Sequence, residues 1–204
     1  TTQIANLKNN QVAAIALDDI TALTTAQVKA LGAAQVKSLT VAQLGALQTD
    51  QIQAIDTSDM AGLSATQVEA WSSTQLRALS TAQVNALNLN VFKALSATQL
   101  QAFSTTQVSK FGDAQIKAMS ASQFDALSTS QLEALTTSQV TLLTVANLAT
   151  LDANDVGSFS TADVRAMTNT QIRSLSSTVL SGMSTAQLNA ITTSLVTNLA
   201  GGAI

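Results

Sequence analysis

Residues Leu79–Leu87 read L-S-T-A-Q-V-N-A-L and hold one copy of an eight-residue unit that recurs along all 204 residues of the chain. The positions spaced by eight from Gln83 number 25, from residue 3 to residue 195, without an insertion or deletion. Seventeen of them hold Gln, four hold Asp and one holds Asn, and we call them the glutamine column. A fixed period is the signature of a repeat architecture, so this octad decides the fold class.

Two further positions of the octad are apolar in every copy. The residue after the glutamine column, Val84 in the quoted unit, is the first apolar column, and the residue three further on, Leu87, is the second. Each is apolar in all 25 copies, which cannot be chance in a chain that is 46% hydrophobic. Residues three apart share one face of a helix. Strict alternation, typical of a half-buried strand, is absent, so each octad is predicted to contain a helix.

The start of each predicted helix carries a capping signal. Ser80 and Gln83 form S-x-x-Q, in which the serine oxygen accepts from the third backbone N–H while the glutamine accepts from the serine N–H. Of the 24 cap positions, 19 hold Ser, Thr, Asp or Asn, and two hold Gly (Gly32 and Gly112), which is tolerated there. Nine of the twelve acidic residues lie in the first four places of the octad, and seven of the nine basic residues lie in one late place. This order suits the dipole of a helix confined to one octad.

One long helix is excluded by the apolar spacing. At about 100° per residue, an eight-residue repeat makes an apolar stripe drift by roughly 80° per octad, so no single partner could cover it. The helix must restart at each cap, and such short pieces must be held by packing. We therefore predict an all-α solenoid of about 25 very short capped helices, with a few octads per coil. It forms one continuous array over residues 1–204, with less regular units in 1–24 and a terminating tail in 200–204.

The composition limits the chemistry. The chain has no His and no Cys, which excludes nucleophile–imidazole pairs and most transition-metal sites. A net charge of −3 with only 10% charged residues is a poor match for nucleic acid. No run of 18 apolar residues occurs, so we expect no membrane span. We predict no enzymatic activity, no cofactor and no metal site.

Two groups of acidic residues allow two interpretations. Asp56 with Asp59, and Asp152 with Asn154 and Asp155, place two carboxylates within one turn. They could form a Ca²⁺ site or an acid/base pair. We favour a structural interpretation, in which Asp fills the cap and glutamine positions of an ordinary octad.

Two polar columns also allow a second interpretation. The glutamine column could be a ladder of amides, but we favour its role in the capping box. Ser/Thr doublets such as Thr136-Thr137 could bind ice or carbohydrate, but we favour their role as caps and first-turn residues.

The position after the first apolar column varies freely, and we call it the variable column. One varying residue per repeat is how some solenoids recognise an extended ligand. Any solvent-facing position also looks like this, and we favour that interpretation. The candidate ligand-facing residues of this column are Lys29, Lys37, Gln53, Glu69, Arg77, Asn85, Lys93, Gln101, Lys117, Glu133, Arg165 and Arg173. Lys110 lies instead in a column of mostly Ala, and it must reach solvent if that column is buried.

The unit Leu127–Leu135, L-S-T-S-Q-L-E-A-L, resembles repeat tracts in very large secreted or surface proteins of bacteria, of the adhesin and RTX type. The resemblance implies an extracellular spacer or adhesive segment. The glycine-aspartate nonapeptides that bind calcium in RTX proteins are absent, so calcium dependence is not implied. Because residue 1 is Thr rather than Met, we expect a fragment of a longer protein or a mature form.

We expect a non-enzymatic spacer or adhesive segment of a larger protein, secreted or at the bacterial cell surface. Its partners would be the flanking domains of a longer chain, with a surface glycan or protein as a further partner. The alternative is a solenoid binding module that recognises a peptide or glycan through the variable column.

Overall fold

The computed structural model describes residues 1–191 of the chain. The chain divides into two compact units, residues 1–111 and 112–204, and each is described here by itself. Residues 1–184 contain 22 α-helices and one 3-10 helix, each within its own octad, and the described residues contain no β-strand. This confirms the prediction of an all-α solenoid of very short helices. The predicted twenty-fifth helix and the tail at 200–204 lie outside the described residues.

These 23 helices are four to six residues long. Unit 1 holds α1 (Thr2–Ala5), α2 (Asn9–Ala13), α3 (Leu17–Ala22), α4 (Thr25–Lys29), α5 (Ala33–Ser38), α6 (Val41–Ala46), α7 (Thr49–Ala54), α8 (Thr57–Met60), α9 (Ala65–Glu69), α10 (Ser73–Ala78), α11 (Thr81–Ala86), α12 (Leu89–Ala94), α13 (Ala97–Ala102) and α14 (Thr105–Val108). Unit 2 holds α15 (Asp113–Ala118), α16 (Ala121–Asp125), α17 (Thr129–Glu133), α18 (Thr137–Val140), α19 (Val145–Leu148), the 3-10 helix η1 (Asp155–Ser158), α20 (Thr161–Ala166), α21 (Asn169–Arg173) and α22 (Ser177–Gly182). Residues 185–191 are also helical.

Each helix starts afresh at its cap residue. Ser80 has extended backbone angles, φ −66° and ψ 156°, and its Oγ accepts from the backbone N–H of Gln83 at 3.2 Å. The Ser80 N–H donates in turn to Oε1 of Gln83 at 2.9 Å, which completes the predicted capping box. Leu87 ends α11 in an extended conformation, φ −59° and ψ 127°, so the chain turns at once into the next octad. The octads near residue 1 are less regular, because Lys8 and Ala16 cap α2 and α3 without a side-chain hydrogen bond.

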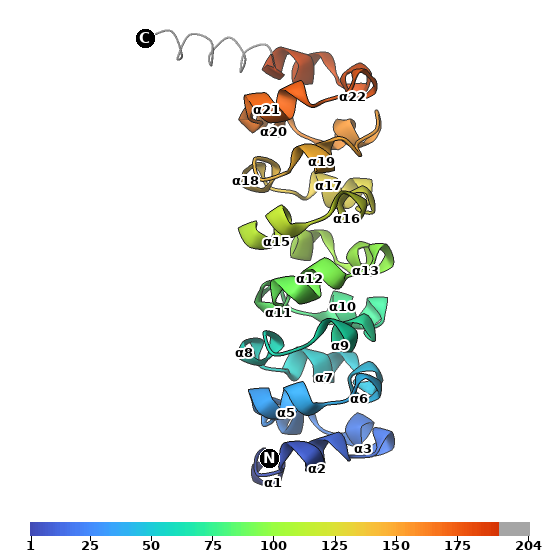
Figure 1. Ribbon diagram of the computed structural model, residues 1–204, viewed down its shortest axis with the longest axis vertical. Coiled ribbons are helices and arrows are strands. Elements are labelled where there is room, and N and C mark those ends of the chain that lie inside the picture. Colours follow the sequence, from blue (N-terminus) through green and yellow to red (C-terminus); the bar gives the residue numbers. More distant parts are fainter. Residues whose placement is uncertain (192–204) are drawn as a thin grey trace, which may run out of the picture. The chain divides into compact units, whose positions relative to one another are not determined.

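Within each unit, a helix packs against the helix three octads further along the chain. In unit 1, α4, α7, α10 and α13 pack in this way one after another, and Figure 1 labels the last three of them. In unit 2, α16 packs against α19 and α17 against η1. The glutamine side chains reach further back, to carbonyl groups 28 and 31 residues earlier. One coil therefore contains between three and four octads, a number that the sequence pattern does not give.

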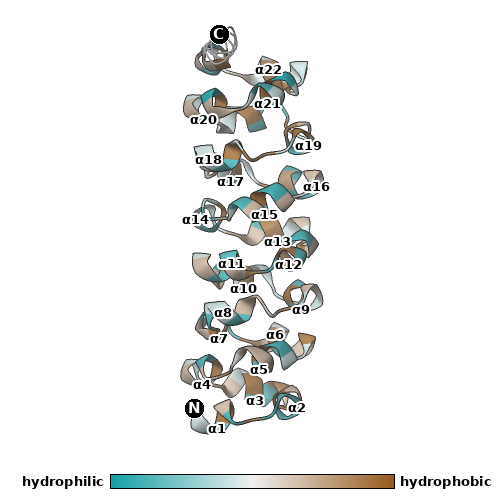
Figure 2. Ribbon diagram, turned by 60° about the vertical axis from the view of Figure 1, so that its left-hand side comes forward, coloured by the Kyte–Doolittle hydropathy of each residue, from teal (hydrophilic) through white to brown (hydrophobic). Residues whose placement is uncertain are grey.

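The two apolar columns face opposite directions along the solenoid. In the first coil of unit 1, Val12 of the first column is 0% exposed, whereas Leu7 of the second column is only half-buried. In the last described coil of unit 2 the order is reversed, since Leu180 of the first column is 37% exposed and Met183 of the second only 7%. The first column therefore packs toward the following coil and the second toward the preceding one. Figure 2 shows that hydrophobic and hydrophilic residues occur within the same short helix.

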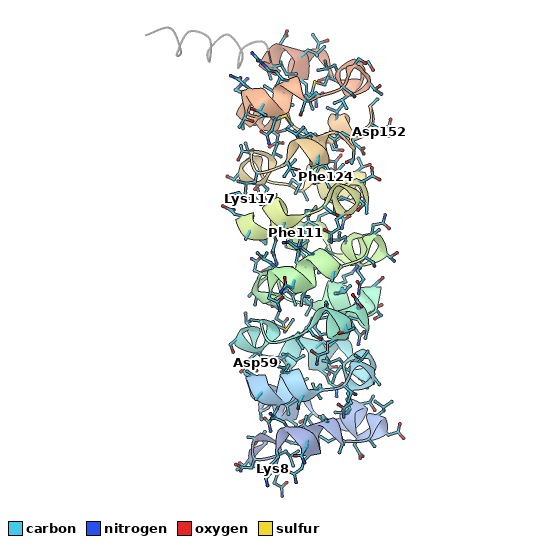
Figure 3. All side chains as sticks on the ribbon, in the orientation of Figure 1. Lys8, Asp59, Phe111, Lys117, Phe124 and Asp152 are labelled. Atoms are coloured by element: carbon cyan, nitrogen blue, oxygen red, sulfur yellow. The ribbon has the colours of Figure 1, made fainter. Side chains whose placement is uncertain are left out.

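Three phenylalanines from three consecutive octads of unit 1 meet in its core. The ring of Phe111 meets the rings of Phe92 and Phe103 edge-on, with centroids 5.2 Å and 5.5 Å away (Figure 3 labels Phe111). Phe92 comes from the first apolar column and the other two from the second. Edge-to-face pairs add stabilisation beyond the buried area. The sequence shows no superperiod of large residues, yet these three, from three consecutive octads, meet in the core.

Gly182 in α22 is required by a close approach of two backbones. A Cβ added there would lie 2.6 Å from Cα and 2.8 Å from the carbonyl carbon of Ala153. We expect Gly182→Ala to lower the free energy of unfolding by about 2 kcal/mol, because the backbone has to move. Urea unfolding followed by circular dichroism measures this change. The matched control is Gly157→Ala, whose Cβ would meet no atom within 4 Å. Equal losses from the two variants would contradict this packing.

Candidate functional site

All twelve candidate residues of the variable column are exposed. Figure 3 shows one of them, Lys117 of α15, at the periphery of unit 2. In unit 1 the variable column is divided among separate stacks of helices, where a stack is a series of helices that pack against one another three octads apart. Lys29 and Arg77 lie on the stack that contains α4, α7 and α10, Lys37 lies on α5, which packs against α8, and Lys93 lies on α12, which packs against α9. Consecutive members therefore belong to different stacks. That any of them faces a ligand stays a prediction.

Two members of the variable column use their side chains within the solenoid. Nε2 of Gln53 donates to the carbonyl oxygen of Ala78 at 2.9 Å, and Nε of Arg77 donates to that of Ala102 at 3.3 Å. Each bond joins a helix to the helix that packs against it three octads further along. Lys110, in the alanine column, is exposed, as its charge requires.

The glutamine column carries a second set of hydrogen bonds besides the capping box. Nε2 of Gln83 donates to the carbonyl oxygens of Ile52 and Ile55, at 2.9 Å and 2.8 Å, in the preceding coil. We call this pair of bonds an amide tie. Each tie joins a side-chain amide to carbonyls at the end of a helix, where not every carbonyl has a backbone partner. The carbonyl of Ile52 also accepts from the backbone N–H of Ile55, at 3.2 Å. Further ties are made by Gln35, Gln43, Gln51, Gln67, Gln75, Gln99, Gln107, Gln171 and Gln187.

The capping interpretation of the glutamine column is therefore confirmed but incomplete. The side chain is buried, with 2% of Gln83 exposed, and all its polar atoms are used. A signal for this second role was present in the sequence. A capping box accepts Glu as readily as Gln, yet the column contains no Glu in 25 copies. Of these two side chains, only the amide of Gln can accept from a cap and also donate to carbonyl groups, because an ionised carboxylate only accepts.

Two octads without glutamine make a substitute contact. At Val91 the cap residue Asn88 takes over, because its Nδ2 donates to the carbonyl oxygens of Ala61 and Leu63 at 3.1 Å and 2.9 Å. At Asp163, a carboxylate that has no N–H to offer accepts instead from Oγ1 of Thr137 at 2.7 Å. Hydroxyl and amide groups thus keep these coils connected where the column departs from Gln.

The second group of acidic residues forms a cap. Oδ1 of Asp152 accepts from the backbone N–H groups of Asn154 and Asp155, at 2.7 Å and 2.8 Å, and Oδ2 of Asp155 accepts from the N–H of Asp152 at 3.0 Å. The N–H groups of Asp155 and Asn154 hold the pKa of Asp152 below its ordinary value. Figure 3 shows Asp152 at the edge of unit 2. Over residues 1–191, no three acidic, His or Cys side chains gather to hold a metal ion.

Asp59, in the glutamine column of α8, is only 6% exposed. Burial raises the pKa of its carboxyl, the hydroxyl of Ser58 at 3.3 Å lowers it, and the charge of Asp56 raises it again, with a net upward shift. Asp163 accepts from Thr137, which lies 26 residues earlier in the chain. The residue 26 places before Asp59 is Ala33, which has no hydroxyl to donate. Asp59 is thus a buried carboxylate in a place that suits an amide.

We expect Asp59→Gln to raise the free energy of unfolding by about 1–2 kcal/mol at pH 7, because an amide tie replaces a buried charge. An upward pKa shift means that Asp59 favours the folded state most below its unfolded pKa of 3.8, and that this contribution is lost as the pH rises through the folded pKa. The advantage of the variant should therefore shrink as the pH falls toward 4. Urea unfolding at several pH values measures it.

The matched control for Asp59→Gln is Glu69→Gln, which makes the same chemical change at an exposed position of the variable column. It should shift the unfolding midpoint little at any pH. An advantage of Asp59→Gln that grows in acid would show that the buried carboxylate is not the cause.

In the part of the chain that the structure describes, no helix has the length and apolarity needed to cross a membrane. A search of curated proteins finds no match to the chain.

A family profile, the ALTTAQ repeat, matches residues 12–49, 52–89, 108–145 and 156–193. All four matches begin at the first apolar column, at Val12, Ile52, Val108 and Val156, so they follow the octad register found above. Residues 22–27 read A-L-T-T-A-Q. The intervals without a match contain Val91 and Asp152, where the octad departs from its usual form. Because the matches cover most of its length, the chain belongs to the ALTTAQ repeat family and is a structural repeat protein.

Proposed function

We propose that this structural repeat protein is a spacer, a segment of a larger secreted or cell-surface protein that holds other modules apart or presents them for adhesion. The feature that supports this best is the amide tie. It repeats from coil to coil, as at Gln75, Gln83, Gln99 and Gln107, so that each added coil is fastened to the one before. Such an array gains length by adding octads and needs no other element.

The placement of the variable column also favours a spacer over a binding module. A solenoid that reads an extended ligand needs its varying residues along one continuous surface. Here Lys29, Lys37 and Lys93 lie on different stacks of helices, and Gln53 and Arg77 use their side chains to join helices. The basic residues of unit 1 would thus be divided among several surfaces.

A binding screen tests the spacer against the alternative. The whole chain is applied to a glycan array and a peptide library, beside the variant Lys29→Ala/Lys37→Ala/Arg77→Ala/Lys93→Ala. The control variant, Lys8→Ala/Lys110→Ala, removes basic residues outside the variable column. A spacer predicts the same binding profile for all three proteins. Saturable binding that only the fourfold variant loses would contradict the proposal and establish recognition through the variable column.

The proposed location has its own test. Protease treatment of intact source cells, followed by detection with an antibody against the chain, should remove the signal without lysis. Protection of the chain until the cells are lysed would contradict a surface location, and its absence from both the surface and the medium would contradict secretion.

A further inference from the structure

Three consecutive octads of unit 2, residues 144–167, lack the usual amide ties. Their glutamine column holds Asn147, Asp155 and Asp163. Asn147 has a shorter side chain than Gln, and its Nδ2 donates to one carbonyl of the preceding coil, that of Met119 at 3.2 Å. Asp155 and Asp163 are carboxylates, whose oxygens accept from Asp152, Ser160 and Thr137 and so give no amide donor to the preceding coil.

Two of the three octads that follow, at Gln171 and Gln187, provide the comparison within the same unit, and the octad between them has Val179 in the glutamine column. Gln171 makes a full tie to Val140 and Leu143, both at 2.9 Å, and Gln187 makes one to Val156 and Phe159 at 2.8 Å and 2.7 Å. Beyond the first coil, unit 1 has two octads without Gln, at Asp59 and Val91. Each of them lies between two octads that make amide ties. Since a coil contains between three and four octads, the three octads without a full amide tie amount to most of one coil.

Apolar packing does not distinguish this coil. Leu148, Val156 and Val164 are all 0% exposed, like the first apolar column elsewhere. The difference lies in the polar contacts and the backbone. The octad at Asp155 forms a 3-10 helix, which has poorer hydrogen-bond geometry than an α-helix, and Oγ of Ser158 is buried without a partner among the described residues. These features weaken attachment to the preceding coil while leaving the core in place.

We propose that residues 144–167 form a release coil, the coil of unit 2 that detaches first from its predecessor when the array is loaded or fluctuates. The inference deepens the proposed spacer function, because a spacer with one weak coil lengthens at a fixed place before the rest unfolds. Local opening in proteins starts where few contacts oppose it. Each missing hydrogen bond changes the opening equilibrium by about fivefold.

Native-state hydrogen exchange of the whole chain, read by mass spectrometry, tests this inference. We expect the backbone amides of 144–167 to exchange at least about tenfold faster than those of 168–191. The variant Asn147→Gln/Asp155→Gln restores ties toward Ile116 and Met119 and toward Phe124 and Leu127, the residues 31 and 28 places earlier, and should slow exchange in 144–167 by about fivefold or more. The control Gln171→Asn should speed exchange around α21 instead.

Equal or slower exchange in 144–167 than in 168–191 of the wild-type chain would overturn the release coil, whether or not the variants fold. So would a folded double variant whose exchange in 144–167 is unchanged. Exchange is measured without reference to location or ligand, so this failure would leave the spacer proposal standing. Conversely, ligand binding through the variable column would contradict the spacer proposal and would leave the hydrogen-exchange prediction unaffected.

Discussion

Replacing Gln83 with leucine is expected to lower the free energy of unfolding by about 3 kcal/mol, although leucine is the more hydrophobic side chain. The reason is the number of backbone groups that one glutamine satisfies. The N–H of Ser80 loses its acceptor, the buried carbonyl of Ile55 loses its donor, and the carbonyl of Ile52 keeps only the backbone N–H of Ile55. A buried polar group left without a partner costs about 1–3 kcal/mol, and the added apolar surface offsets part of this total. Urea unfolding followed by circular dichroism at 222 nm gives the change.

The matched control is Gln101→Leu, which makes the same substitution at an exposed place in the variable column of α13. It should change the stability by less than about 0.5 kcal/mol. Gln83→Glu separates the two roles of the glutamine, because a carboxylate still accepts from the cap but cannot donate to the carbonyls. Stability of Gln83→Glu close to that of the wild type would show that the amide tie contributes little and that capping alone explains the column.

Val84→Asp is expected to cost about 4 kcal/mol or more, enough to unfold much of the surrounding array. Val84 belongs to the first apolar column and is 0% exposed, so the carboxylate would be buried among apolar side chains. Asn85→Asp introduces the same carboxylate one residue later, at an exposed position, and should change stability by less than about 0.5 kcal/mol. Thermal and urea unfolding of both variants, at equal concentration, give the comparison.

The two variants differ by one position along the chain, which makes them a strict test of which face each residue occupies. If both lose the same stability, the assignment of the columns is wrong. If Val84→Asp is stable at pH 7, the first apolar column does not form the core.

Much of the fold follows from the octad alone. The caps, the helix length and the two buried columns are all local features, and a local pattern such as Ser80 to Leu87 is enough to predict them. The number of octads per coil is not local. It depends on the backbone angles at residues such as Ser80 and Leu87, and small changes there, repeated in every octad, would alter which coils meet.

The amide tie was missed for the same reason. Gln83 and its acceptors Ile52 and Ile55 are 31 and 28 residues apart, and no local pattern joins them. The preference for Gln over Glu in the column was the one visible sign. The substitute contacts of Asn88 and Thr137 are harder still to predict from the sequence. These residues look like ordinary cap and first-turn residues until the coil that they contact is known.

The octad at Asp152 shows a further feature that the sequence does not predict. Its two aspartates satisfy the capping pattern, which was predicted, yet the helix that follows is a short 3-10 turn. Asn154, the residue before that turn, has helical backbone angles, φ −81° and ψ −40°, and the equivalent position in the octad of Ser80 lies within α11. The residue types of this octad do not predict a 3-10 helix in place of an α-helix.

Backbone chemical shifts of the whole chain, assigned by nuclear magnetic resonance, test the central claim most directly. If the helix restarts at every octad, carbon shifts will be helical over blocks of about six residues and extended at each cap, with a period of eight along residues 25–139. Helical shifts that run without interruption through Ser72, Ser80 and Asn88, or extended shifts throughout, would contradict the account.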